Sequence, residues 1–378
     1  MTKTKLNAIH IHTDLKFLHN TQMFEGAYFT NTSIVLSKNK AADVKNTDAL
    51  LYGTEQEDLQ RLVDLCTQAD LVVLYDLNPI KIKLVLALPK EVKIAWRFFG
   101  YELYSKRPDL FKSDLSRKYD KKFFSNNLSR ILSRYYNLIF KGNRIINIDS
   151  RVLNRINYFL ALSQEEYDFL KFYWPNLPHF IKVPHFYLKE KIVEVDFQKK
   201  QQPNPVVIIG NNRSSYNNHL DLVEIIENNA NKKCYNFTLL FSYGSKGNYA
   251  KEVIRKTINK SYFTIINNFL GKEDFTKIYH NASALVINGY RQMAGANIRT
   301  ALANGVNVYL NHKNAHKQFL ENQGFKLFSI EDFEADLKNN KLGLDKAAAL
   351  HNIDNFKRFN EAYTKEDFQS KIMNLINA

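Results

Sequence analysis

The stretch VVIIGNNRSSYNNHL, residues 206–220, decides what kind of fold this chain can have. An apolar, β-branched run ends at Gly210, a polar loop follows, and a helical pattern begins near His219. A loop between a strand and a helix can aim its amides and the helix N-terminus at a phosphate. The loop lacks the spacing of G-x-G-x-x-G and of the Walker motif. An ordinary Asn-capped turn fits the same spacing.

A second stretch, VINGYRQMAGANIRTALANGVNVYLN at residues 286–311, repeats this order of features. A strand gives way to a loop of small and polar residues, and then to a helix over 297–303. Asn304 and Gly305 end that helix before the next strand begins. Two loops that can each bind a phosphate in one half of the chain fit a nucleotide diphosphate.

Strand-like and helical segments alternate through all 378 residues, which predicts an α/β fold with parallel, doubly wound sheets. We expect two Rossmann-like domains, 1–190 and 191–378, with a polar linker at 189–205. Ligands of such sheets bind at the carboxyl ends of the strands. The expected strands cover 6–11, 33–36, 69–75, 92–98, 157–162, 205–209, 237–242, 263–266, 284–287 and 306–310.

The charge is strongly positive, with 53 Lys and Arg against 38 Asp and Glu, a net +15. Residues 106–155 hold roughly 13 Lys or Arg and roughly 4 Asp or Glu, interleaved with aromatics. Within this segment Arg130, Arg134 and Lys141 lie off an apolar helical stripe. The segment is therefore a solvated helix face, a contact for an anionic membrane, or a nucleic-acid surface.

Several classes of protein are excluded or disfavoured by composition. No apolar run is long enough to span a bilayer, and the N-terminus lacks the apolar core of a signal peptide. The two cysteines, Cys66 and Cys234, predict neither a disulfide framework nor a zinc site. Scattered histidines and the lack of G-x-S-x-G give no support to metal or hydrolase chemistry. We expect a cytoplasmic protein with no bound metal and no cofactor.

Short motifs along the chain resemble the TDP-N-acetylfucosamine:lipid II N-acetylfucosaminyltransferases, glycosyltransferase family 56. The likeness is strongest between residues 206 and 311. The matching segments are Gly210-Asn211 with Asn217-Asn218-His219, Tyr243-Gly244 with Tyr249, Arg291-Gln292, Ala303-Asn304-Gly305 with Leu310-Asn311, and Phe99-Gly100-Tyr101-Glu102-Leu103-Tyr104.

This resemblance implies a GT-B fold, in which two Rossmann-like domains face a central cleft. The N-terminal domain would bind the acceptor and face the membrane, and the C-terminal domain would bind the nucleotide-sugar. Family members transfer a deoxy-amino-sugar from a TDP donor to a polyprenyl-diphosphate-linked saccharide, without a catalytic metal. The implied location is peripheral, at the inner face of the cytoplasmic membrane, in surface-polysaccharide assembly such as that of O-antigen.

Two departures leave the donor (TDP- or UDP-sugar) and the stereochemistry open. The family's Gly-x-Gly-Thr reads Ala294-Gly295-Ala296-Asn297 here. Large retaining GT-B families place two carboxylates around this loop and helix, where this chain has Arg291 and Thr300.

The predicted donor site combines loop amides, polar side chains and a cation for the leaving diphosphate. Arg291 is the first choice for that cation, and Tyr243 with Gly244 would lie near the base and ribose. An arginine in a loop is otherwise a surface ion-pair partner. The full predicted set is Gly210, Asn211, Arg213, Ser214, Asn217, Asn218, His219, Tyr243, Gly244, Arg291, Gln292, Gly295, Asn297 and Thr300.

An inverting transferase also needs a base for the acceptor hydroxyl. Glu102 follows the strand at 92–98, Asp14 follows the first strand, and Asp76 follows the strand at 69–75. Each could instead cap a helix or pair with a surface cation. His10 and His12 alternate with apolar residues, so we expect one of them to face the core.

Two other functions remain open. A nucleic-acid-binding protein would use the basic 106–155 segment, although it would leave the two loops unexplained and has no recognisable binding signature. A GT-B nucleotide-sugar epimerase would use the loops but not the basic segment. A glycosyltransferase explains both the two loops and the basic segment. Its expected partners are a nucleotide-sugar donor, a lipid-linked or glycan acceptor and an anionic membrane surface, and we expect no nucleic acid.

Overall fold

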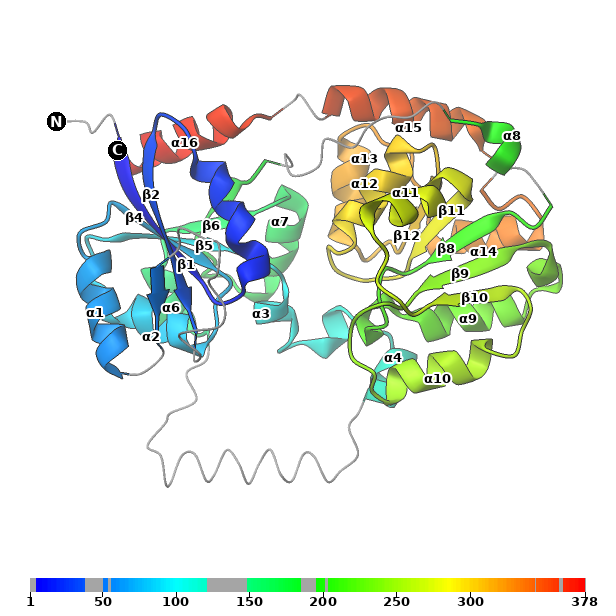
Figure 1. Cartoon of the computed structure of the whole chain (residues 1–378), viewed down its shortest axis with the longest axis horizontal. Helices are drawn as coiled ribbons and strands as arrows, with labels where there is room; N and C mark the ends of the chain where they lie inside the picture. Colours follow the sequence, from blue (N-terminus) through cyan, green and yellow to red (C-terminus); the bar gives the residue numbers. More distant parts are fainter. Residues whose placement is uncertain are drawn as a thin grey trace. The chain divides into compact units, whose positions relative to one another are not determined.

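A computed structural model describes residues 5–37, 50–53, 56–120, 148–184, 195–200, 203–343, 345–359 and 363–377 (Figure 1). The chain divides into two compact units. Unit 1 takes its described residues from Met1–Leu103, Ile131–Phe186 and Tyr363–Ala378, and unit 2 takes its own from Tyr104–Arg130 and Tyr187–Ala362. Each unit is an α/β domain with one parallel sheet, as the alternating pattern predicts.

The sheet of unit 1 has seven parallel strands in the order β3-β2-β1-β4-β5-β6-β7. Its central strand β4 reads LVVLY and is buried along its whole length, as expected for a parallel strand covered on both faces. The strands are β1 (Leu6–His12), β2 (Phe29–Leu36), β3 (Leu50–Tyr52), β4 (Leu71–Tyr75), β5 (Lys93–Arg97), β6 (Tyr158–Ala161) and β7 (His179–Lys182).

Helices connect these strands and begin at recognisable caps. Asn78 caps α2 with Pro79 in its first turn, and Ser163 caps α7 by accepting from the amide of Glu166. The elements are η1 (Leu15–Phe24), α1 (Gln56–Cys66), α2 (Pro79–Ala87), α3 (Tyr101–Tyr104), α6 (Ser150–Arg155), α7 (Gln164–Tyr173) and α16 (Lys365–Asn377).

Unit 2 has five parallel strands in the order β10-β9-β8-β11-β12. Figure 1 shows its helices on both sides of the sheet, and each side has its own apolar core. The strands are β8 (Val206–Ile209), β9 (Asn236–Leu240), β10 (Phe263–Ile266), β11 (Ala282–Ile287) and β12 (Asn307–Leu310). The helices are η2 (Pro108–Leu110), α4 (Asp114–Asp120), α8 (Phe197–Lys200), η3 (Ser215–Asn217), α9 (His219–Glu227), η4 (Ala230–Cys234), α10 (Asn248–Thr257), α11 (Lys272–Asn281), α12 (Gly295–Ala303), α13 (Ala315–Asn322), α14 (Ile330–Lys338) and α15 (Lys346–Phe359).

Each sheet has one point at which its strand order reverses direction. It lies between β1 and β4 in unit 1 and between β8 and β11 in unit 2. Ligands of open α/β sheets bind outside the carboxyl ends of the strands at such a point. The loops after these four strands are therefore where a site is expected in each unit.

The boundary between the units differs from a simple division near residue 190. Residues 104–120 belong to unit 2, where Ser113 donates its amide to Asn218 Oδ1 at 2.9 Å and its hydroxyl to Asp221 at 2.7 Å. Helix α16 belongs to unit 1, where Gln369 donates to the Met23 carbonyl at 2.8 Å. The expected linker contains α8, whose Lys200 is buried.

Candidate functional site

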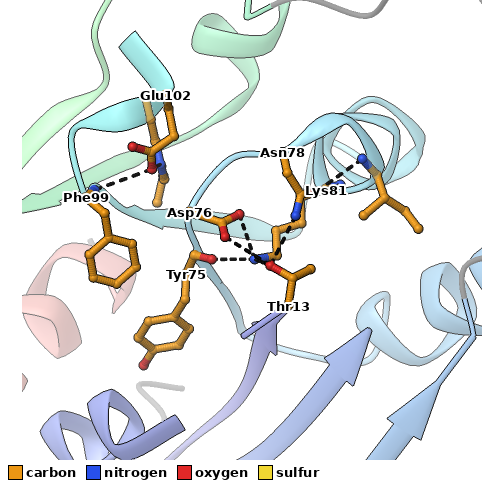
Figure 2. A network of polar contacts seen from close by, with 9 residues as sticks. Thr13, Tyr75, Asp76, Asn78, Lys81, Phe99 and Glu102 are labelled. Carbon is orange, nitrogen blue, oxygen red and sulfur yellow. Dashed lines mark hydrogen bonds and ion pairs between the residues drawn. The ribbon is translucent and has the colours of Figure 1, made fainter. Parts of the chain in front are cut away.

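A compact polar network lies at the switch point of unit 1 (Figure 2). Asp76 follows β4 and accepts hydrogen bonds from Thr13 Oγ1 at 3.0 Å and from Lys81 Nζ at 2.9 Å. Thr13 follows β1, so this bond joins the loops after the two central strands. Asn78 donates its Nδ2 to Thr13 Oγ1 at 3.2 Å while its Oδ1 caps α2.

Lys81 is wholly buried and also donates to the Tyr75 carbonyl and to Thr13 Oγ1. Burial lowers the pKa of Lys81, while the adjacent Asp76 carboxylate acts in the opposite direction. Asp76 has a backbone φ of 73°, a left-handed conformation that costs a residue with a Cβ roughly 1–2 kcal/mol. Because both of its carboxylate oxygens hold partners, Asp76 belongs to a closed ion pair.

Glu102 lies in α3, next to this network. Its side chain is 3% exposed, and its Oε1 accepts from Trp96 Nε1 at 3.3 Å and from the Phe99 amide at 3.4 Å. Its Oε2 is buried and has no hydrogen-bond partner within the described residues. Burial, with a further contribution from the Asp76 charge, raises the pKa of Glu102 to about 7. A carboxyl group with one uncommitted oxygen and this pKa is suited to general base catalysis near neutral pH.

Tyr101 precedes Glu102 on α3 and is partly exposed. Its side chain is 48% exposed, and burial of its remainder raises the pKa of the phenol, with further contributions from Asp76 and Glu102. The negative charges of Asp76 and Glu102 therefore both act on the Tyr101 phenol. Glu102 is buried, but the residue before it is open to solvent.

The loop after β1 places the third acidic candidate. Asp14 is half-buried, and its carbonyl accepts from the Phe17 amide at 3.1 Å at the start of η1. His10 and His12 are both buried, where we expected one, and burial lowers their pKa values to about 4 and about 3. Of the predicted acids, the structure brings Asp76 and Glu102 together, and Glu102 has the properties of a base. Its role remains a prediction.

The predicted glycine turn is present after β8 in unit 2. Gly210 has a φ of 67°, and a Cβ there would lie 2.4 Å from His219 Nε2, so only glycine fits. His219 is fully buried, its Nδ1 lies 3.2 Å from the Tyr249 hydroxyl, and burial lowers its pKa to about 3. In this structure His219 is a neutral packing residue beneath the loop.

Asn217 and Asn218 are also fully buried. Asn217 accepts from the Asn211 amide at 3.2 Å and donates to the Asn212 carbonyl at 3.1 Å. Asn218, at φ 51°, donates its Nδ2 to the Asn288 carbonyl at 2.8 Å. Both side chains hold the loop in shape, so any contribution they make to ligand binding passes through the loop backbone.

Sequence reasoning did not identify Asn288, which joins the two central strands of unit 2. It donates to the Asn218 carbonyl at 3.3 Å, and its Oδ1 accepts from Asn311 Nδ2 at 2.7 Å. Asn288 and Asn311 come directly after β11 and β12, and Asn218 ends the loop between β8 and α9, so the network joins the loops after three strands. An Asn directly after a buried strand was the available signal, because its amide can bond the neighbouring loop.

Arg291, the predicted diphosphate cation, lies in the loop after β11. Its guanidinium carbon is 5.1 Å from the ring centre of Tyr216 and 5.7 Å from that of Tyr104, which orients the side chain by cation–π contacts. The next residue, Gln292, has both amide atoms buried without a hydrogen-bond partner among the described residues. A buried, unsatisfied amide costs about 1–3 kcal/mol, so a polar ligand that reached it would regain that energy.

The helix after this loop presents one open position. Gly295 begins α12, and a Cβ there would meet no atom within 4 Å. Asn297 is buried and donates to the Tyr279 hydroxyl at 2.8 Å, and Thr300 is buried on the same helix. The start of α12 can thus receive a ligand at Gly295, whereas Asn297 and Thr300 face the interior.

The remaining predicted donor residues form one packed surface. Arg213 donates its amide to the Tyr243 carbonyl at 3.0 Å, and its guanidinium donates at 2.6 Å to a carbonyl in the loop after β9. A Cβ at Gly244, φ 102°, would lie 2.7 Å from Ser214 Oγ. Asn211 donates to the Tyr243 hydroxyl at 3.3 Å, while the Tyr243 ring is 50% exposed and available for stacking.

Three predicted membrane-contact residues, Arg130, Arg134 and Lys141, lie outside the described residues. Within the described part of the chain, no helix is both long and apolar enough to cross a bilayer. The same described residues contain no group of three His, Cys, Asp or Glu placed to hold a metal ion.

A cavity of about 220 Å³ in unit 2 is lined by Lys200, His280 and Asn304, and no predicted site residue lines it.

The sequence matches no protein-family model and no curated protein. Solved structures do match over nearly the whole chain. A sucrose-phosphate synthase from Thermosynechococcus elongatus has a TM-score of 0.65 at 10% identity, with 98% of each chain covered. The lipopolysaccharide outer core galactosyltransferase WaaB has a TM-score of 0.58 at 11% identity, with 98% of each chain covered. An alpha-glucosyltransferase in complex with UDP has a TM-score of 0.52 at 9% identity, covering 98% of this chain and 99% of that chain.

These neighbours are GT-B glycosyltransferases, and the expected GT-B fold is confirmed: this chain has two parallel-sheet α/β domains of that architecture. Sequence identities near 10% establish the fold alone. The chemistry of this chain has to be argued from its own strand-end residues.

Proposed function

We propose that this protein is a metal-independent glycosyltransferase that uses a TDP- or UDP-sugar donor. In this proposal it transfers a deoxy-amino-sugar to a lipid-linked or surface-glycan acceptor at the inner face of the cytoplasmic membrane, as the likeness to glycosyltransferase family 56 implies. The observation that carries the proposal is Glu102, whose buried carboxyl group lies at a strand-end edge of a GT-B fold and has one oxygen with no partner in the part of the chain that the structure describes.

The donor would bind to unit 2 at the ends of β8 and β11. There the Asn218–Asn288 bonds hold two loops together, and Gly295 leaves room for a phosphate beside the first turn of α12. Arg291 would place its positive charge beside the diphosphate, where charge develops as the nucleotide leaves. The exposed ring of Tyr243 would stack on the base.

The transfer step requires one base and one leaving group. Oε2 of Glu102 would take the proton from the acceptor hydroxyl while the hydroxyl oxygen bonds to the anomeric carbon. The bond from that carbon to the diphosphate would break, and the nucleotide diphosphate would leave with the bonding electrons. This displacement inverts the anomeric centre, so the configuration of the product tests it directly.

The acceptor side of the proposal rests on charge. The 106–155 segment carries most of the surplus positive charge of the chain and would attract an anionic membrane and a diphosphate-linked acceptor. Sedimentation with anionic vesicles should fall when Arg130, Arg134 and Lys141 are neutralised together. Unchanged sedimentation would remove these residues from the membrane role.

A screen of TDP- and UDP-sugars with a synthetic lipid-diphosphate acceptor tests the activity itself. We expect turnover that persists in EDTA and that falls by at least about 100-fold in Glu102→Gln and in Arg291→Ala. Matched controls are Glu91→Gln, an exposed acid of unit 1, and Arg255→Ala, a surface arginine of unit 2 that pairs with Glu252. Full activity of Glu102→Gln would refute its role as the base.

The alternatives have distinct outcomes in the same screen. Interconversion of nucleotide-sugars without an acceptor would identify an epimerase. Tight oligonucleotide binding with a steep salt dependence, in a protein that no nucleotide stabilises against heat, would identify a nucleic-acid-binding protein.

A further inference from the structure

The buried Asp76–Lys81 pair has no part in the transfer step proposed above. Lysine is among the residues least often fully buried, yet Lys81 has no exposed surface. It connects three parts of unit 1, since Asp76 follows β4, Lys81 lies on α2 and Thr13 follows β1. The network therefore sits at the switch point, the edge where ligands of such sheets bind.

Stability is a weak explanation for this arrangement. Desolvating two charges offsets most of their attraction, so apolar residues of similar volume often stabilise a protein equally well or better. Asp76 also holds a left-handed backbone conformation, which costs energy at any residue with a Cβ. Strain of this kind is concentrated at functional sites.

Both charges of the pair act on Glu102. The Asp76 carboxylate disfavours ionisation of Glu102, and the Lys81 ammonium and Glu102 attract each other. The other groups that act on Glu102 in the described residues are the Tyr101 phenol and three neutral donors, its own backbone amide, Trp96 Nε1 and the Phe99 amide. In the view of Figure 2, the Asp76 carboxylate lies between the Glu102 carboxylate and the Lys81 ammonium.

We propose that Asp76 and Lys81 are positioning residues that control the charge on the Glu102 carboxyl group. In this arrangement the Asp76 carboxylate raises the proton affinity of Glu102, so the ionised Glu102 is a stronger base toward the acceptor hydroxyl. The Lys81 ammonium limits that effect and, through Thr13, fixes Asp76 in place. The inference deepens the proposed function, because it rests on Glu102 acting as the base.

Opposite shifts in two variants test the proposal without an activity assay. The full chain is labelled with ¹³C at Glu carboxyl carbons, and Glu102→Gln assigns the Glu102 signal. Asp76→Asn should make Glu102 release its proton at lower pH, with a proton affinity reduced up to about tenfold. Lys81→Met should raise that affinity. Lys83→Met, an exposed lysine on the same helix, should leave it unchanged.

A measurement on the wild type covers the case in which a single variant does not fold. With ¹³C at Asp carboxyl carbons, the Asp76 signal should move with the midpoint of the Glu102 titration, and this response should disappear in Glu102→Gln. Shifts in the same direction in both variants, or an Asp76 signal that ignores the Glu102 titration, would overturn the proposal.

Transfer assays separate this inference from the proposed function. If the protein is a transferase, the acid limb of its pH–kcat/KM profile should move with the Glu102 titration in each variant. A lost or lowered rate with an unmoved acid limb would indicate a purely structural pair. The Glu102 titration could shift in opposite directions in Asp76→Asn and Lys81→Met although the protein transfers no sugar. That result would support the charge coupling and refute only the proposed transferase function.

Discussion

Replacing Glu102 by Gln should stabilise unit 1 at high pH and change its stability little at low pH. Burial raises the pKa of Glu102 from 4.5 to about 7, so ionising it in the folded state costs free energy. The sign follows from linkage: the folded state binds the proton more tightly, so stability falls as pH rises from the unfolded pKa through the folded one. At about 1.4 kcal/mol per pH unit, the full cost is about 3 kcal/mol.

Tryptophan fluorescence can follow this effect in unit 1 alone. The chain has 2 tryptophans, Trp96 and Trp174, and both belong to unit 1. Urea unfolding of the wild type and of Glu102→Gln should show a stability difference that grows by about 3 kcal/mol between about pH 4 and about pH 9. Glu91→Gln is the exposed control and should show no such trend. A difference independent of pH would mean that Glu102 titrates normally, and the argument for it as a base near neutral pH would fail.

Three further predictions concern unit 2. Gly210→Ala should destabilise it by about 2–4 kcal/mol in chemical unfolding, since positive φ and the contact with His219 both oppose a Cβ, whereas Gly295→Ala should change stability by less than about 1 kcal/mol. Arg291→Ala should abolish most thermal stabilisation by TDP or UDP while shifting the unliganded melting temperature little, and intact stabilisation would exclude it from the phosphate site. Ser113→Ala should cost about 1–3 kcal/mol and speed amide exchange in α4, because Asp221 loses a 2.7 Å hydrogen bond; unaltered exchange would contradict that anchoring role.

The two strand-end edges that carry the candidate sites could be predicted from local sequence patterns. Buried parallel strands appear as continuous apolar runs, and a glycine or a polar residue directly after the run marks the strand end, as at Gly210 and Asp76. Turn glycines are also local features, because φ depends on the residue itself and its immediate neighbours. The sequence therefore predicted which loops lie at these two strand-end edges.

The direction of individual side chains could not be predicted in this way. Asn217, Asn218 and His219 have the composition of a ligand-binding loop, yet all three are fully buried and bond protein groups. Their partners include Ser113, which is 105 positions from Asn218 in the chain. Contacts across such separations leave no periodic signal in the sequence.

By itself, the sequence determined the α/β class, the parallel strands and the loops that end them, because apolar periodicity and turn residues act over a few neighbouring positions. Only the tertiary structure decided that residues 104–120 pack on unit 2, that α16 packs on unit 1, and that Asp76 is paired while Oε2 of Glu102 has no hydrogen-bond partner among the described residues. Thr13 and Asp76 meet across 63 positions. The burial and the pKa of a side chain depend on such long-range contacts, because all the groups around it in space determine how far it is desolvated.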